Sequence, residues 1–280
     1  MAKKGWAAFP YADKAYDYTG ASLAKSWKTL HAGDGEPFPD DTHMARLFKA
    51  NPKLGKDAAA TASALQEAWR AFHRGDFEAA FEQGKALKAL GASVAIKAAG
   101  IHATYLVDGE KEKLARYEAL AALAEEAIAS LPGEANSHYR RAFAIGRYSQ
   151  CISITKALTQ GLASKVKESL DATLELAPKH AEAQTALGLY HAEIVGKVGG
   201  MLAKLTYGAS AAIAEKHLTE ATRLTPASPI AWIEFGNGLL LLHGDKREDA
   251  AAEAYSKAAK LKPRDAMEAL DVAWAKDQLA

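Results

Sequence analysis

The side chains that could carry out chemistry are nine histidines, one cysteine and paired carboxylates such as Glu125-Glu126. A zinc site normally needs three or four ligands of the His, Cys, Asp or Glu type. His180 with Glu182, or His191 with Glu193, supplies two at most, and the sequence contains no His-Glu-x-x-His motif. We therefore predict no metal site and no cofactor.

Nucleophilic catalysis is not supported by the spacing of the reactive residues. Cys151 and His138 form the one conceivable Cys/His pair, but they are 13 residues apart. On a single helix this spacing is about 20 Å along the axis, because an α-helix rises 1.5 Å per residue. We interpret Cys151 as a buried structural thiol. No Gly-x-Ser-x-Gly motif occurs either, and the sequence predicts that the protein is not an enzyme.

A segment rich in glycine and lysine covers residues 196–208. A phosphate-binding P-loop needs Gly, four residues and then Gly-Lys-Ser/Thr. Here Gly196-Lys197 is followed by valine and has no upstream glycine at the required spacing. We interpret 196–208 as a flexible loop whose apolar side chains pack back over a helix pair. The alternative is a loop that contacts a ligand, with candidate contact residues Lys197, Lys204 and Tyr207.

Positive charge is concentrated between residues 140 and 167. Arg140, Arg141 and Arg147 precede three lysines, and no acidic residue follows these lysines until Glu168. A solvated helix face is the favoured interpretation. The sharper alternative is a site for an acidic peptide tail or a carboxylate, because arginine binds carboxylates through two parallel hydrogen bonds.

Composition describes a globular chain and excludes several classes of partner. Of 280 residues, 49% are hydrophobic and 25% are charged. Lys and Arg number 35 against 34 Asp and Glu, a net charge of +1, whereas a dedicated nucleic-acid binder would be basic. No apolar run approaches the roughly 20 residues of a membrane span, and the N-terminus does not resemble a secretory signal. We expect a cytoplasmic protein without nucleic-acid partners, periplasmic only if a leader has been removed.

The elements that must position these residues are helices arranged in repeats. From about Asp57 onward the chain shows helical periodicity, broken by proline and glycine. Four units share one register, in which a proline follows the second apolar position by 8 residues. The units are Gly100-x2-Ala103 with Leu120-x3-Ala124 and Pro132; His138-x2-Arg141-Ala142 with Val166-x3-Leu170 and Pro178; Gln184-x2-Leu187-Gly188 with Ala214-x3-Leu218 and Pro226; and Trp232-x2-Phe235-Gly236 with Ala251-x3-Tyr255 and Pro263.

This pattern resembles the tetratricopeptide repeat, W-x2-L-G-x2-Y…A-x3-F…P. The resemblance implies an all-α, right-handed solenoid of antiparallel helix pairs, in which small residues such as Gly188 and Gly236 let paired helices approach closely. Gly75-Asp76-Phe77 indicates a fifth, earlier pair, and residues 265–280 are expected to form a capping helix. We assign residues 57–280 to the array and residues 1–56 to a non-repeat region. The aromatic residues of that region either pack on the first repeat or form an arm for self-association.

The array departs from the ordinary repeat in its spacing. The intervals from the small residue to the second helix are 20, 24, 26 and 15 residues, and these insertions within helix pairs mark places where binding loops often lie. We call the unit of His138 the third unit, because the pair at Gly75-Asp76-Phe77 precedes the four listed ones. In this third unit we expect a long first helix that ends near Gly161. Together with Tyr139-Arg140-Arg141-Ala142 and Gly199-Gly200…Tyr207-Gly208-Ala209-Ser210, the insertions are similar to a branch that includes the T component of TRAP transporters and the regulator-of-microtubule-dynamics proteins. That resemblance implies a helical protein that partners a transporter's substrate-binding protein and self-assembles.

The function that we predict is a non-enzymatic scaffold that binds a protein, a peptide or a small carboxylate in the concave groove of the array. In such arrays the first helix of each pair lines the groove. The candidate groove residues are Asn136, Tyr139, Arg140, Phe143, Arg147, Glu182, Thr185, Leu189, Glu193, Ile233 and Asn237. The alternative is a structural assembly subunit that forms homo-oligomers, with a transporter's substrate-binding protein as its partner.

Overall fold

The computed structural model describes residues 5–280, which are all-helical and contain no β-strand. This part of the prediction is confirmed. The chain forms two compact units. The first contains the described residues up to Leu30, together with Glu36–Leu176 and Asp265–Met267, and the second contains His31–Gly35, Ala177–Arg264 and Glu268–Ala280.

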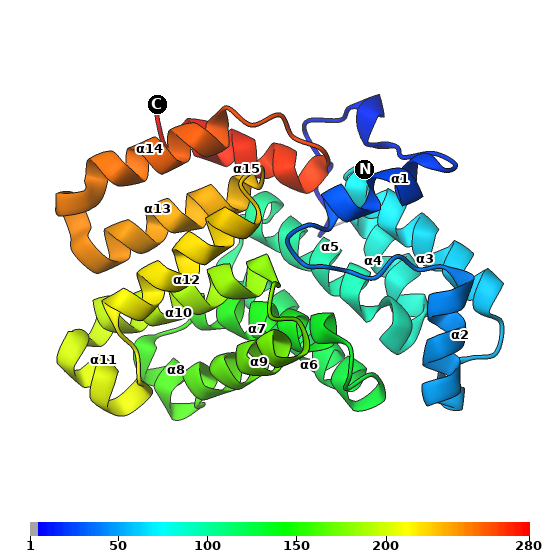
Figure 1. Ribbon diagram of the computed structural model, residues 1–280, viewed down its shortest axis with the longest axis horizontal. Helices are drawn as coiled ribbons and strands as arrows, with labels where there is room; N and C mark the ends of the chain where they lie inside the picture. The colour runs from blue at the N-terminus through cyan, green and yellow to red at the C-terminus, as the bar shows by residue number, and fades with distance from the viewer. Residues whose placement is uncertain (1–4) are drawn as a thin grey trace. The chain divides into compact units, whose positions relative to one another are not determined.

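The first unit contains nine of the α-helices that the structure describes (Figure 1). They are α1 (Ser22–Leu30), α2 (Asp41–Ala50), α3 (Ala58–His73), α4 (Phe77–Ala86), α5 (Ala92–Leu106), α6 (Glu110–Ser130), α7 (Ala135–Gln150), α8 (Ile154–Thr159) and α9 (Leu162–Leu176). Short 3₁₀ turns lie at Lys14–Tyr16, Pro52–Leu54 and Lys88–Gly91.

Helices that follow one another in the first unit also pack against one another. Contacts join α3 to α4, α4 to α5, α5 to α6, α6 to α7, and α7 to α9. The ends of several helices are set by side-chain caps: Asp57 accepts a hydrogen bond from the Ala60 N–H at 3.0 Å, and Asp40 accepts one from the His43 N–H at 2.7 Å. Such caps satisfy backbone donors that have no partner within the helix. One core, around Ile96 and Leu120, joins α5, α6 and α7.

The second unit is built from the later helices, again packed in chain order. They are α10 (Ala181–Val198), α11 (Gly200–Tyr207), α12 (Ala211–Leu224), α13 (Pro229–His243), α14 (Glu248–Ala259) and α15 (Ala266–Asp277), with a 3₁₀ turn at Gly244–Arg247. Contacts join α10 to α12, α10 to α13, α12 to α13, and α13 to α14 (Figure 1). In α15, Trp274 meets the Tyr255 ring edge to face at 5.7 Å.

Two glycines of the second unit lie where paired helices come close together. A Cβ added at Gly188 would lie 2.6 Å from Leu218 Cγ, and one at Gly236 would lie 2.7 Å from Tyr255 Cε1. Both distances are far shorter than a carbon–carbon contact in a packed core, about 3.5–4 Å. Glycine is therefore required at these two crossings for the helices to pack as they do.

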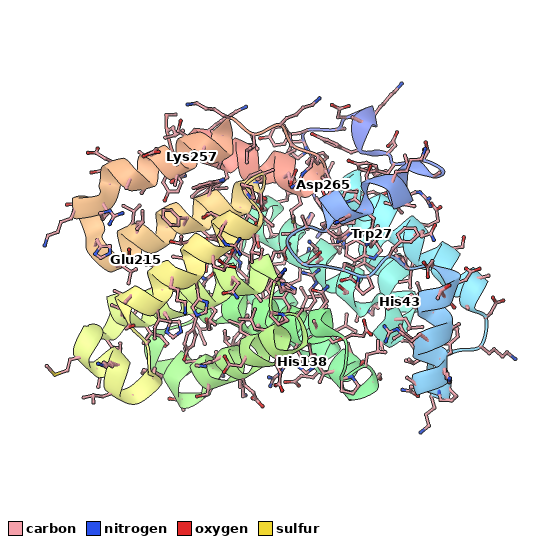
Figure 2. All side chains as sticks on the ribbon, in the orientation of Figure 1. Trp27, His43, His138, Glu215, Lys257 and Asp265 are labelled. Carbon is pink, nitrogen blue, oxygen red and sulfur yellow. The ribbon has the colours of Figure 1, made fainter. Side chains whose placement is uncertain are left out.

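A hydrogen bond recurs where three of the long helices begin. In each case a side chain in the first turns of the helix donates to the carbonyl of a proline six residues earlier in the chain. The pairs are His138 Nε2 with Pro132 O at 2.9 Å, Gln184 Nε2 with Pro178 O at 3.4 Å, and Trp232 Nε1 with Pro226 O at 2.9 Å. His138 is labelled in Figure 2. Three chemically different donors thus hold the turn before the helix in the same way.

Two expectations about the insertions are wrong. The first helix of the third unit ends at Gln150 rather than near Gly161, and a separate short helix, α8, follows it. The Ser153 hydroxyl accepts a hydrogen bond from the Lys156 N–H at 3.3 Å, so this serine caps a new helix instead of continuing the old one. Residues 196–208 do not form a loop, because Gly200–Tyr207 is helical.

Helix α11 begins and ends at glycines that adopt left-handed backbone conformations. Gly199 has φ 80° and Gly208 has φ 62°. The Gly208 N–H donates to Lys204 O, and the Ala209 N–H donates to Ala203 O at 3.1 Å, so carbonyls of the last turn find partners beyond the helix. Gly199 and Gly208 therefore mark the two ends of a helix. The interpretation of these glycines as a sign of a flexible loop is wrong.

Aromatic residues of the N-terminal region pack on helices of the first unit. Trp27, labelled in Figure 2, meets the Trp69 ring edge to face at 5.7 Å. Phe9 lies 6.2 Å from Phe77, and Trp6 lies 5.6 Å from Phe81. For these residues the structure shows ordered packing, as in the first of the two alternatives that the sequence left open.

Candidate functional site

The strongest candidate site lies in the first unit, around the guanidinium of Arg140 on α7. Only 2% of Arg140 is exposed. Its Nε donates to the Ser93 hydroxyl at 3.2 Å, and Ser93, at the start of α5, donates to Glu36 Oε2 at 2.7 Å. The same carboxylate oxygen lies 3.9 Å from Arg140 Nη2. We refer to Arg140, Ser93 and Glu36 as the Arg140 site.

Glu36 belongs to an irregular segment, residues 36–40, that is held largely through its backbone. The Trp27 indole N–H donates to Glu36 O at 2.7 Å, and the Gln66 amide donates to Pro39 O at 2.8 Å. Phe38 packs edge to face on Trp27 with ring centroids 5.1 Å apart. Pro37 and Pro39 keep the segment out of a helix, because proline cannot donate a backbone hydrogen bond. The first unit therefore binds an extended acidic segment of its own chain.

The electrostatics of the Arg140 site follow from its burial. An arginine stays protonated in proteins, and an isolated charge in the interior carries a large desolvation cost. The Glu36 carboxylate and the Ser93 hydroxyl offset that cost, and the Arg140 guanidinium also lies 5.2 Å from the Tyr139 ring centre. This arrangement allows α7 to bind a carboxylate through the guanidinium of Arg140.

The other charged residues of the third unit behave differently from one another. Arg141 donates to the Ser169 hydroxyl at 2.8 Å and to Glu125 at 3.3 Å, so it fastens α7 to α9 and α6. The expectation of a solvated basic face is therefore wrong for Arg140 and Arg141. The expectation of a solvated basic face holds for Lys156 and Lys165, which are exposed.

The remaining groove candidates of the first unit are Asn136, Phe143 and Arg147 on α7. Asn136 is buried, as is Tyr139, while Phe143 and Arg147 are half-buried. The Arg147 guanidinium lies 5.9 Å from the Phe143 ring centre and donates to Gln150 at 3.2 Å. Phe143 fills the space above Gly100, where an added Cβ would lie 2.2 Å from the ring. These side chains serve the packing of α5 and α7 as well as any groove.

Candidates in the second unit are engaged in contacts of their own. Buried Thr185 donates to Ala181 O at 3.0 Å, and buried Ile233 joins the core around Ala258. Asn237 donates to Glu234 at 2.8 Å and accepts from the Tyr255 hydroxyl at 2.7 Å. The last three candidates, Glu182, Leu189 and Glu193, are half-buried. The Glu182 N–H donates to Gly33 O at 2.9 Å, and the Glu193 carboxylate pairs with Lys197 at 3.0 Å.

The predicted packing of residues 196–208 over a helix pair is wrong for the apolar side chains of α11. Met201 is 82% exposed and Leu205 is 80% exposed. Of the candidate contact residues, Lys197 and Lys204 are exposed, and Tyr207 is half-buried. The face of α11 that carries these apolar residues points to solvent.

Sequence reasoning missed Glu36 and Ser93 as members of a site. The available signal was the Glu36-Pro37-Phe38-Pro39 run, in which one acid lies among residues that favour an extended chain. Cys151 is half-buried rather than buried, and burial raises the pKa of its thiol above the usual range. Within residues 5–280, no three His, Cys, Asp or Glu side chains are grouped so that they could hold a metal ion. The prediction of no metal remains a prediction.

A second polar cluster of the first unit holds the start of the described chain. Arg116 on α6 lies 4.5 Å from the Trp6 ring centre, and it donates to the Gly5 carbonyl and to His102 Nδ1, the latter at 2.8 Å. His102 Nε2 lies 3.2 Å from Ala7 O. Burial, reinforced by the charge of Arg116, lowers the pKa of His102 to about 4. This cluster binds the chain through backbone carbonyls and one indole ring.

In the part of the chain that the structure describes, no helix is long and apolar enough to cross a membrane. Comparison with known proteins adds no further assignment. No family model matches the chain, and no curated protein is significantly similar to it.

Proposed function

We propose that this protein is a non-enzymatic binding scaffold of the tetratricopeptide type that recognises an extended, carboxylate-bearing segment of a protein partner. The observation that carries this proposal is the Arg140 site, where α5 and α7 hold the Glu36 carboxylate of an irregular segment. Displacement of the internal segment would expose Arg140 and Ser93 to a carboxylate of a partner. The proposal assigns no catalytic step to any residue.

The repeat class is supported by recurring contacts at equivalent positions. The hydrogen bond to a proline carbonyl appears in three units, and Gly188 and Gly236 lie against the second helices of their own pairs. The branch that includes the transporter T component remains a proposal based on residue patterns. A substrate-binding protein of a transporter is one partner of the proposed kind.

A direct test measures the binding of an acetylated, fluorescein-labelled peptide of residues 36–42 to the full chain carrying Glu36→Gln. This substitution weakens the contact of the internal segment with Arg140 and Ser93. We expect saturable binding by fluorescence anisotropy. Replacing the peptide's glutamate with glutamine should weaken binding about tenfold or more, because a hydrogen bond to a charged group contributes about 1.5–3 kcal/mol. Arg140→Met in the receptor should have a similar effect, and circular dichroism checks that the variant is folded.

The matched control is Arg147→Met, which removes a half-buried arginine from the same helix but not from the Arg140 site. It should leave the affinity unchanged. Equal affinity for the glutamate and glutamine peptides would show that carboxylate recognition is not the function of this surface.

A further inference from the structure

Helix α11 in the second unit presents large apolar side chains to solvent. Met201, Leu202 and Leu205 are 82%, 53% and 80% exposed. On a helix, residues three and four positions apart are neighbours, so Leu205 lies beside both Leu202 and Met201. The three side chains form one surface, the α11 apolar face. Single exposed apolar residues are ordinary, but a contiguous group indicates an interaction site.

The opposite side of α11 is anchored to the rest of the unit. Ala203 is fully buried, and α11 packs on α10. Gly199 and Gly208 bound the helix with left-handed conformations that fix its ends. The apolar face is therefore held outward by a folded element. Figure 1 shows this short helix between α10 and α12.

The charged residues of the segment that contains α11 are all basic. Residues 196–208 contain Lys197 and Lys204 and no acidic residue. Lys204 lies on α11 itself and is exposed, and Lys197 is exposed although it pairs with Glu193 on α10. Tyr207, half-buried, closes the helix. Exposed leucine and methionine beside lysine, with a tyrosine at the end, is the composition of helices that lie in the interface of a lipid bilayer.

We propose that α11 docks the protein, peripherally and reversibly, on an anionic lipid surface. The α11 apolar face would enter the boundary between headgroups and acyl chains, and Lys204 and Lys197 would contact the anionic headgroups. A symmetric dimer through this face would enclose Lys204 of each copy, and residues 196–208 of the other copy would supply no acidic partner for it. The proposal uses α11 alone and does not depend on the function of the Arg140 site.

The test is co-sedimentation of the full chain with vesicles of phosphatidylcholine containing 30% phosphatidylserine, and with vesicles of phosphatidylcholine alone. We expect binding to the anionic vesicles and much weaker binding to the neutral ones. The double variant Met201→Ser/Leu205→Ser should lower the partition coefficient about tenfold or more, because burial of each such side chain contributes about 1.5–3 kcal/mol. Lys204→Glu should remove most of the preference for anionic lipid.

The control variant is Leu176→Ser on α9, because Leu176 is 46% exposed and lies in the other unit. It should bind vesicles like the unchanged protein. All the substituted side chains are exposed, so circular dichroism should show unaltered folding. The proposal is overturned if the unchanged protein does not sediment with anionic vesicles, or if the double variant binds them equally well. It is also overturned if light scattering shows a dimer that the double variant dissociates, since a second copy would then cover this face.

Discussion

Buried charged and polar side chains in this protein meet specific partners from distant parts of the chain. Arg140 reaches Ser93 and the carboxylate of Glu36, which is more than one hundred residues earlier. His102 lies between the Arg116 guanidinium and the Ala7 carbonyl. Arg140, which stays protonated, meets an acidic partner, whereas burial and the neighbouring Arg116 keep the His102 ring neutral.

The environment of His102 predicts how stability depends on pH. A guanidinium can only donate and a carbonyl can only accept, so Nδ1 accepts from Arg116 and Nε2 carries the proton. Because the folded-state pKa, about 4, lies below the ordinary value of about 6.5, the unfolded chain takes up a proton first. The free energy of unfolding should therefore fall as the pH drops from about 6.5 to about 4, by up to about 1.4 kcal/mol per pH unit.

Urea unfolding of the unchanged protein and of His102→Gln, measured between pH 7.5 and 4.5, checks this prediction. Glutamine can accept from Arg116 and donate to Ala7 but does not titrate, so its loss of stability over this range should be smaller. Parallel pH profiles for the two proteins would show that His102 does not contribute to the acid sensitivity.

At the scale of the element, the starts of three long helices, α7, α10 and α13, are tied to the turns before them. His138, Gln184 and Trp232 occupy equivalent positions, and each donates to the carbonyl of a proline six residues earlier. A carbonyl in such a turn has no partner within a helix, so the side chain satisfies it. The bond fixes the direction in which the chain enters the helix, which matters where helices pack in sequence.

We expect His138→Leu to destabilise the protein by about 1 kcal/mol, the usual net contribution of a hydrogen bond. His138→Gln should retain most of the stability, because Gln184 makes the same bond at the equivalent position of the next unit. Urea unfolding at pH 7.5 measures both variants. If the two variants lose equal stability, the bond to Pro132 does not hold this turn.

At the scale of the whole molecule, each compact unit contains its own apolar side chains that are almost completely buried. Ile96 in the first unit is 0% exposed, and Leu218 in the second is 1% exposed. Cavity-creating substitutions at such positions cost about 2–5 kcal/mol. In proteins built from consecutively packed helices, stability is approximately a sum of local terms.

Hydrogen exchange read by mass spectrometry should therefore show local effects. Leu218→Ala should accelerate exchange mainly in α10, α12 and α13, whereas Ile96→Ala should accelerate it mainly in α4, α5 and α6. These are the helices that pack with the substituted ones. Uniform acceleration over the whole chain by either variant would show that the two units unfold as a single cooperative body.

The sequence by itself determined the helical class and the breaks between helices at Pro132, Pro178, Pro226 and Pro263. These features depend on local properties: the 3.6-residue period, helix propensity, and the breaks made by proline and glycine. The same local reasoning failed at Ser153 and at Gly199–Tyr207. A serine that caps a new helix looks like a residue within a long one, and glycines that delimit a short helix look like a flexible loop.

Only the tertiary structure decided which side chains are exposed and which partners they meet. The pairing of Glu36 with Arg140 joins residues far apart in the chain, and periodicity contains no information about such contacts. The solvent exposure of Met201 and Leu205 likewise depends on which face of α11 packs on α10. Helix formation is set by neighbours along the chain, whereas burial is set by neighbours in space, and both proposed binding surfaces depend on the second.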